Sequence, residues 1–241
     1  MSETEKWRNI LTRIIDVVIF LSQRGLAFRS SSQRIDDIHN GHFLGIIELL
    51  ANYDPILAEH VAKVRASQEK GERLQVHYIS GSSQVEFISN CTYYVRSHIL
   101  DEIRAAKYYS VMVDATPDSS HVEQTTFIIR YLAKDDTEFE LKERFLTFVD
   151  CCKKTGADLA SLIMGTLKHF VIPIKHCREQ GYDNAPNMSG KYNGTQQHIL
   201  AVNPLCIYSP CACHSLNLCG LDSASCCMEA VTFFWSNANS L

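Results

Sequence analysis

Hydrophobic residues in the first hundred positions recur every three to four residues, which is the period of a helix with one buried face. The first such stripe runs from Trp7 to Leu21, and a second covers residues 42–52. Asp54-Pro55 then supplies an N-cap and a first-turn proline for a third helix. The N-terminal part of the chain is therefore predicted to be entirely helical.

A polar connection and a longer helix are predicted next. Residues 66–76 are polar and contain a glycine, which indicates a surface connection. Ser83 and Glu86 have the spacing of a capping box, which predicts the start of a helix that runs to about residue 107. Residues 1–107 are accordingly assigned to a helical N-terminal segment.

From residue 108 onward the pattern changes from helical spacing to alternation. A compact apolar run ends in an acid and a proline turn, and two alternating runs separated by a charged turn follow it. The predicted order is strand-strand-strand-helix-strand-helix-strand-helix. This order is typical of an α/β fold with a mixed five-stranded sheet flanked by helices, so residues 108–241 are assigned to one such domain.

Composition and charge narrow the classes of protein that fit. The chain has 241 residues, of which 46% are hydrophobic, enough for one substantial core with or without a smaller helical lobe. A formal net charge of -4 gives no broad basic field, so DNA is a candidate partner that the charge does not support. The chain start lacks a signal-peptide pattern and no apolar run is long enough to cross a bilayer, which predicts an intracellular protein without a membrane partner.

The candidate chemistry depends on two aspartates that follow predicted strands. Asp114 closes the first predicted strand, and Asp183, in GYDNAPNMSG, closes the fourth. If these strands are parallel neighbours, both carboxylates emerge at the same end of the sheet. Two bare carboxylates about 4 Å apart repel by roughly 4 kcal/mol at an effective dielectric near 20, so the pair requires a cation or a shared proton. Oxygen-only ligation favours Mg²⁺ or Mn²⁺, the metals of phosphoryl transfer, which normally also needs a third acid.

A purely local interpretation of the same residues remains open. Asp114 and Asp183 can simply cap turns. Asp118 is expected to form a local turn in ATPD, although it is also a secondary candidate for the same metal. Asn184 and Asn187 are further secondary candidates that can equally serve to satisfy the backbone at a helix start.

Cysteine is concentrated in the C-terminal part of the chain. The cluster comprises Cys206, Cys211, Cys213, His214, Cys219, Cys226 and Cys227. It lacks the paired spacings of a zinc site, so structural zinc is not expected, and a zinc-organised interaction module is kept only as an alternative. A catalytic Cys211–His214 pair is disfavoured, because both are predicted to lie on a strand, where residues three apart point to opposite faces.

Several segments together carry a family resemblance. They are VDATPDSSHVEQTTFIIRYL, GYDNAPNMSGKYNGTQQHI and SPCACHSLNLCG, preceded by LAFRSS and HFLGIIELLANYDPILAEH. In this order they resemble the transposase-like domain of zinc finger MYM-type protein 1 and its relatives, in the hAT transposase superfamily, with the helical segment that precedes it. The resemblance implies an RNase H-like fold, a nuclear location and an ancestral activity of metal-dependent DNA cleavage and strand transfer.

The resemblance also assigns roles to individual residues. Asp114 matches the first acid position, in DATPD, and Asp183 matches the second, in YDNAPNM. Cys211 and His214 match the C-x-x-H signature, which the family associates with its active-site region. The family's third acid is a glutamate far beyond that signature, and Glu229 is too close to it to take the role.

The expected function follows from these departures. The domain is expected to be C-terminally incomplete, without the third acid and the dimerisation region, and hence not to cut DNA. Residual binding to nucleic acid or protein is the predicted activity, with the catalytic part of a metal-dependent DNA transposase as the alternative. Exposed apolar surface is expected near Phe233, Phe234 and Trp235, where the missing part would dock.

Overall fold

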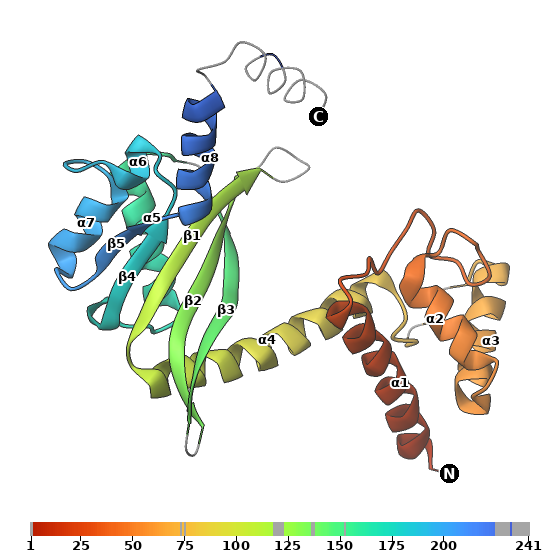
Figure 1. Cartoon of the computed structure of the whole chain (residues 1–241). Helices are drawn as coiled ribbons and strands as arrows, with labels where there is room; N and C mark the ends of the chain where they lie inside the picture. Colours follow the sequence, from red (N-terminus) through yellow and green to blue (C-terminus); the bar gives the residue numbers. More distant parts are fainter. Residues whose placement is uncertain are drawn as a thin grey trace. The chain divides into compact units, whose positions relative to one another are not determined.

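The structure is a computed structural model with two compact units. It describes residues 2–72, 74, 76–117, 123–135, 138–151, 153–224 and 232. The helical unit is Met1–Val95 and the sheet unit is Arg96–Leu241, so the division falls inside helix α4 (Gly81–Ala106) (Figure 1). The boundary expected from sequence, between residues 107 and 108, lies where this helix gives way to the first strand.

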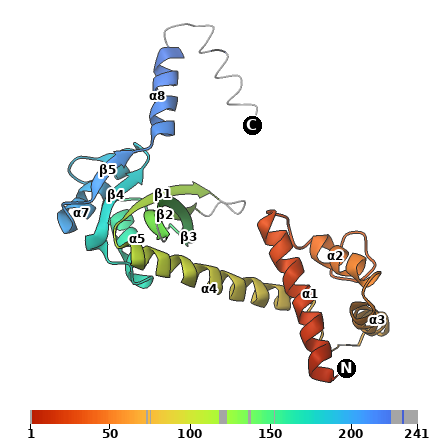
Figure 2. The same ribbon diagram turned by 60° about the horizontal axis from the view of Figure 1, so that its bottom comes forward.

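The helical unit is built from amphipathic helices. It contains α1 (Glu3–Gln23), α2 (Gly41–Ala51), α3 (Pro55–Lys70) and the first part of α4 (Figure 2). The buried residues of α1 recur with helical spacing: Ile10, Ile14, Val17, Val18 and Leu21. They pack with buried side chains of α2 and α3, including Phe43, Ile47 and Leu57. The all-helical N-terminal segment is thus confirmed.

Two local predictions in this unit are wrong. Helix α3 continues to Lys70 and ends at Gly71, whose φ of 66° is left-handed, so the connection begins after residue 70 and not at residue 66. Helix α4 begins at Gly81, and the N–H of Ser83 donates to Oγ of Ser80 at 3.2 Å. The cap therefore lies three residues before the predicted one, because Ser80 offers the same hydroxyl chemistry.

The sheet unit confirms the predicted α/β architecture. Its strands are β1 (Tyr109–Pro117), β2 (Glu123–Asp135), β3 (Glu138–Asp150), β4 (Cys177–Tyr182) and β5 (Ile207–Pro210), in the order β3-β2-β1-β4-β5. β1, β2 and β3 pair antiparallel, whereas β4 is parallel to β1 and β5 is parallel to β4. The other elements are α5 (Gly156–His169), η1 (Ile174–His176), α6 (Pro186–Ser189), α7 (Thr195–Val202) and α8 (Ala212–Ala224).

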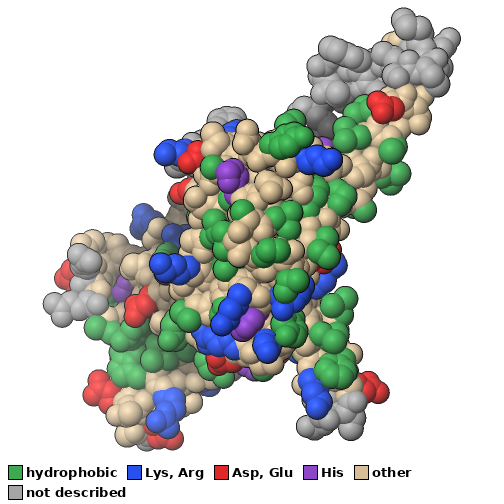
Figure 3. All heavy atoms as spheres, turned by 90° about the vertical axis from the view of Figure 1, so that its left-hand side faces the viewer, with side chains coloured by type: hydrophobic (Ala, Val, Ile, Leu, Met, Phe, Trp, Pro, Cys, Tyr) green, Lys and Arg blue, Asp and Glu red, His purple; other side chains and the backbone are tan. Residues whose placement is uncertain are grey.

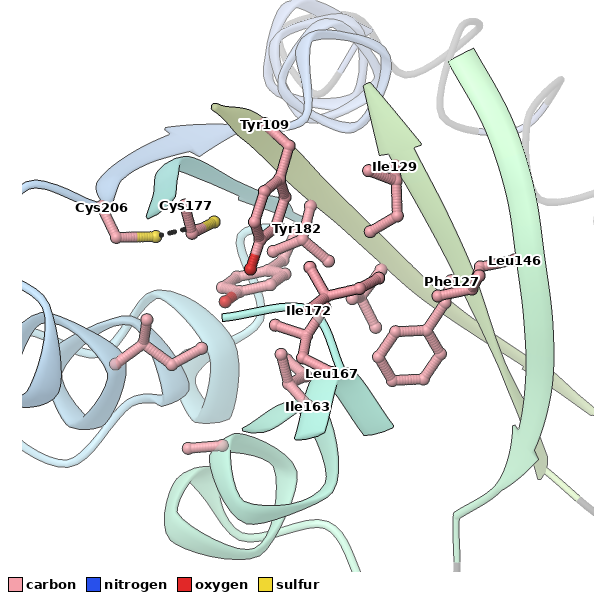
Figure 4. Close-up of a cluster of buried hydrophobic side chains, with 14 of the residues drawn as sticks. Tyr109, Phe127, Ile129, Leu146, Ile163, Leu167, Ile172, Cys177, Tyr182 and Cys206 are labelled. Atoms are coloured by element: carbon pink, nitrogen blue, oxygen red, sulfur yellow. Dashed lines mark hydrogen bonds between the residues drawn. The ribbon is translucent and has the colours of Figure 1, made fainter. Parts of the chain in front are cut away.

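One face of the sheet carries the core. Val111 and Phe127, from β1 and β2, are fully buried in one cluster with Ile163 and Leu167 of α5. Figure 4 shows Phe127, Ile163 and Leu167 in this cluster. Ile103, near the end of α4, belongs to the same cluster. Figure 4 also shows two adjacent thiols at the edge of the core, where Cys206 donates a hydrogen bond to Sγ of Cys177 at 3.3 Å. Both cysteines are fully buried, which suits a residue that behaves as a small hydrophobe when its thiol is free.

The opposite face, called the outer face here, carries the other half of each strand. Asp114 pairs with Thr126 and Thr126 pairs with Phe148, so these three residues share a row across the sheet. Phe145 and Phe148 are exposed on β3, with ring centroids 4.7 Å apart. Between them, a bulge in β3 turns Leu146 into the core.

Glu102 fixes the end of α4 to the sheet. Its carboxylate accepts hydrogen bonds from the hydroxyl of Tyr131 on β2 and from Nζ of Lys142 on β3, the latter at 2.9 Å. These two hydrogen bonds hold the pKa of Glu102 below its ordinary value, although partial burial acts in the opposite direction. Burial and the Glu102 carboxylate together raise the pKa of Tyr131 to about 12.

We expect Phe127→Ala to destabilise the sheet unit by about 3–5 kcal/mol, because it removes a fully buried ring and leaves a cavity. Hydrogen-exchange mass spectrometry on β1 and β2 peptides measures the loss. The matched control is Phe139→Ala, since Phe139 lies on the same sheet but is 66% exposed. Equal losses for the two variants would contradict the assignment of the core.

We expect Glu102→Gln to cost about 1 kcal/mol at neutral pH, since it weakens two hydrogen bonds to a charged group. The pKa of Glu102 is lower in the folded chain than its ordinary value of 4.5. Its stabilisation is therefore present above pH 4.5 and is lost as the pH falls through the folded pKa. Urea unfolding from pH 7 to pH 3 should show the free energies of unfolding of the wild type and of Glu102→Gln converging. The control is Glu140→Gln, whose side chain is 69% exposed, and it should stay within about 0.5 kcal/mol of the wild type at neutral pH.

Candidate active site

The parallel pairing of β1 and β4 aligns the two candidate acids. The pairing ends with Met112 opposite Gly181, and two further residues along each chain lead to Asp114 and Asp183. Neighbouring strands lie about 4.8 Å apart, so the two acids leave the sheet at the same end and next to each other. The expectation that Asp114 closes its strand is wrong, because β1 continues to Pro117 through its pairing with β2. Asp183 directly follows β4, as predicted.

Two cavities meet at these acids. The inner cavity, of about 260 Å³, lies beside α5 and α6 and is lined by Val113, Asp114, Ala115, Glu123, Thr125, Cys151, Lys154, Leu159, Leu162, Ile163, Asp183, Ala185, Asn187 and Met188. The outer cavity, of about 630 Å³, lies on the outer face and at the start of α8. Its lining includes Asp114, Asp183, Cys211 and His214, so the structure brings the two acids and the C-x-x-H residues to one place.

Hydrogen bonds fix the loop that carries Asp183. Oδ1 of Asp183 accepts from the N–H of Ala185 at 3.2 Å, and the hydroxyl of Tyr208 on β5 donates to the main-chain carbonyl of Asp183 at 2.9 Å. Nδ2 of Asn184 donates to Oγ of Ser215 on α8 at 2.9 Å. Burial, followed by the charge of Asp183, raises the pKa of Tyr208, so this hydroxyl keeps its proton and remains a donor.

The start of α5 braces the same loop from the helix-covered side. Nδ2 of Asn187 donates to the carbonyl of Lys154 at 3.0 Å, and the ammonium of Lys154 pairs with Glu123 at 2.5 Å. A Cβ at Gly156 would overlap the carbonyl oxygen of Asn193, so only glycine allows this close approach. The side chain of Asn187 is thus engaged in holding the loop, and Lys154 is a contributor that no sequence motif indicated.

The C-x-x-H residues lie at a helix start and not along a strand. β5 ends at Pro210 and α8 begins at Ala212, so the prediction that Cys211 and His214 point to opposite faces is wrong. Residues three apart on a helix lie on the same side, and both residues line the outer cavity. The N–H of Cys211 donates to the carbonyl of Tyr182 at 2.8 Å, which places this helix start beside the second acid.

Some of the predicted residues lie outside the described parts of the chain. They are Asp118, Cys226, Cys227, Glu229, Phe233, Phe234 and Trp235. Within the described ranges, no three Asp, Glu, His or Cys side chains are grouped so as to hold a metal ion. Two carboxylates nevertheless fit a hard cation, because Mg²⁺ is commonly held by one or two carboxylates together with water and substrate phosphate.

The sheet order, the two acids beside each other on parallel neighbouring strands and the helices that flank the sheet define an RNase-like domain. The family described as ZMYM1/FAM200, RNase-like domain (DUF4371) matches residues 1–194, a span that includes both acids. The chain belongs to this transposase-derived family, which confirms the resemblance seen in the sequence segments.

Curated relatives are more distant. Over 223 residues the chain is 20% identical to the 52 kDa repressor of the inhibitor of the protein kinase from Homo sapiens, covering 90% of this chain and 28% of that protein. The Mus musculus protein of the same name is 22% identical over 142 residues, covering 58% of this chain and 18% of that protein. The chain therefore spans less than a third of the length of these relatives. In the described part of the chain, no helix is both long and apolar enough to span a membrane.

We expect Tyr208→Phe to loosen the Asp183 loop, because it removes the donor to the Asp183 carbonyl. The loss should be about 1 kcal/mol of local stability, seen as faster amide exchange in peptides covering residues 182–190. Tyr192→Phe is the matched control, since Tyr192 is 84% exposed and the change should leave exchange in this loop unaltered. An unchanged exchange rate in Tyr208→Phe would contradict the role given to this hydroxyl.

Proposed function

We propose that this chain is a domesticated hAT transposase domain with an RNase H-like site. The acid pair of that site is kept as a weak Mg²⁺ or Mn²⁺ site. The domain binds nucleic acid or protein partners and does not cut DNA. One observation carries the proposal. Asp114 and Asp183 lie at matching positions of parallel neighbours and line the same cavities, whereas the described residues add no third metal-binding side chain to them.

The two aspartates would hold the metal from different settings. Asp114 is exposed on the outer face, while Asp183 uses Oδ1 to accept from the N–H of Ala185. This bond and the donation from Tyr208 orient the second carboxylate before any cation arrives. When bound, the metal would supply positive charge for phosphate oxygens. His214, which lines the outer cavity, is placed to contact a bound phosphate ester.

The proposal that this domain does not cut DNA rests on the geometry that metal-assisted phosphoryl transfer requires. Phosphoryl transfer by two metals needs both cations fixed within about 4 Å of each other. Two carboxylates leave such cations short of protein ligands, and the activity of concerted sites falls steeply when one member is lost. The domain on its own is therefore expected to bind a cation without productive cleavage.

Partner binding and nuclear location are further parts of the proposal. The formal charge of -4 does not support tight DNA binding by the chain as a whole. The curated relatives are named as a repressor, which supports a regulatory, nuclear role for this chain. A zinc-organised module is one of two alternatives, and metal analysis of the purified protein that finds one zinc per chain would favour it.

Metal binding and DNA nicking provide the test. We expect the purified chain to bind Mn²⁺ weakly, measured by electron paramagnetic resonance, and Asp114→Asn or Asp183→Asn to weaken that binding by on the order of tenfold or more. Asp101→Asn is the control, because the side chain of Asp101 is 73% exposed and pairs with Arg104.

Supercoiled plasmid incubated with the chain and Mg²⁺ or Mn²⁺ should remain intact. Nicking that disappears in both Asp114→Asn and Asp183→Asn would establish the alternative, a catalytic part of a transposase. Mn²⁺ binding that is equal in all variants would remove the acid pair from the metal site altogether.

A further inference from the structure

A group of basic side chains lies at the other end of β1 and β4, where these strands begin. Lys107 precedes β1, Lys175 and His176 belong to η1, and Arg178 is the second residue of β4. In the view of Figure 3, Lys and Arg side chains lie around a histidine in the lower part of the molecule, with acidic side chains close by. Burial first, and then the charges of Lys175, Lys107 and Arg178, lower the pKa of His176, so the three cations act on one spot.

None of these three cations forms an ion pair within the described structure. The ion pairs found there involve other Lys and Arg residues. Like charges placed together disfavour one another, so the cluster gains when an anion binds. A local excess of positive charge therefore exists on a chain whose formal net charge is -4.

Arg178 is held in place before any ligand arrives. Its Nη1 donates to the carbonyls of Lys175 and Cys177 at 2.9 and 3.0 Å, and its guanidinium carbon lies 4.3 Å from the centroid of the Tyr108 ring. A guanidinium has five N–H donors, so three remain for other acceptors. His176 contacts the same ring edge-on. The side chain is thus pre-organised around Tyr108, which lowers the entropy cost of binding an anion.

Lys107 occupies a backbone position that favours glycine. Its φ is 65°, in the left-handed region, where it ends α4 and its N–H donates to the carbonyl of Ile103 at 3.1 Å. Side chains with a Cβ are disfavoured in this conformation, and helices commonly end there with glycine. The lysine therefore costs backbone strain at this position and brings a positive charge beside the other cations.

We propose that Lys107, Lys175, His176 and Arg178 form a binding patch for the phosphate backbone of a nucleic acid, separate from the acid pair. The patch contacts phosphates irrespective of sequence, because it consists of charges and presents no element that enters a groove. The proposal concerns the DNA-binding part of the proposed function, and it places that binding at the amino ends of β1 and β4.

The salt dependence of DNA binding tests the patch. A labelled 30-bp duplex is titrated with the full chain by fluorescence anisotropy between 50 and 200 mM NaCl. Each phosphate contact contributes a slope of about -0.9 to log K against log salt concentration. We therefore expect Lys175→Gln and Arg178→Gln each to weaken DNA binding and to make the salt slope less negative by about 0.9. The control Lys191→Gln removes one exposed positive charge from the loop between α6 and α7.

Lys107→Gly separates binding from folding. Glycine suits the left-handed position, so this variant should be at least as resistant to urea as the wild type. It should nevertheless bind DNA more weakly, because it also removes one positive charge from the patch. In EDTA, with no metal at the acid pair, the wild-type chain should still bind DNA through the patch with its full salt slope, so failure of the metal site and failure of the patch are distinguishable.

Three outcomes of the DNA titration would overturn the proposal. They are absence of DNA binding at 50 mM NaCl, equal losses in Lys191→Gln and the patch variants, and a salt slope that the patch variants leave unchanged. Binding of anionic lipid vesicles or heparin with full patch dependence, but not of duplex DNA, would also overturn it, because the patch would then serve a different polyanion.

Discussion

The parallel pairing of β1 with β4 is the constraint on which the candidate site depends. Its register, with Met112 opposite Gly181, carries two chain segments that are about seventy residues apart in sequence to the same end of the sheet. A shift by one residue would send one of the two acids to the opposite face. Val111 and Gln180 pair with each other and are fully buried on the face that α5 and α7 cover. These two residues oppose such a shift, because the shift would expose them.

The same two strands carry opposite charge at their two ends. Asp114 and Lys107 are seven residues apart, and at about 3.3 Å per strand residue they are separated by roughly 20 Å. The Debye length at physiological salt is about 8 Å, so the acidic and basic ends are largely screened from each other. A net charge computed over the whole chain therefore conceals the property that matters for an anionic partner, which is how the charges are distributed along the strands.

Much of the fold could be predicted from periodicity, because the period of buried positions is a local property. The stripe from Trp7 to Leu21 and the alternation after residue 108 both identified their elements correctly. The errors occurred where two local solutions compete. Ser80 and Ser83 are equally good caps, and the choice depends on tertiary packing against the helical unit, which the sequence pattern does not contain.

The candidate site was less accessible to prediction than the fold. The two acids could be found because each follows a short apolar run in the sequence, although only Asp183 lies at a strand end, and the C-x-x-H pair could be found from the family resemblance. The partners that hold them could not, because Tyr208 and Lys154 are distant in sequence and act through main-chain carbonyls, which any residue possesses. Likewise the strand assigned to Cys211 and His214 was wrong, because a proline, Pro210, ends β5 one residue before Cys211.

The bulge at Leu146 has a consequence for the behaviour of this chain in a crowded cell. β3 is a long edge strand, and a long, flat edge with exposed phenylalanines would offer a template for stacking of further chains. One extra residue breaks the even spacing of its free N–H and C=O groups and increases the local twist. A second strand can then align with only one half of this edge at a time, which protects the molecule from open-ended fibrous assembly.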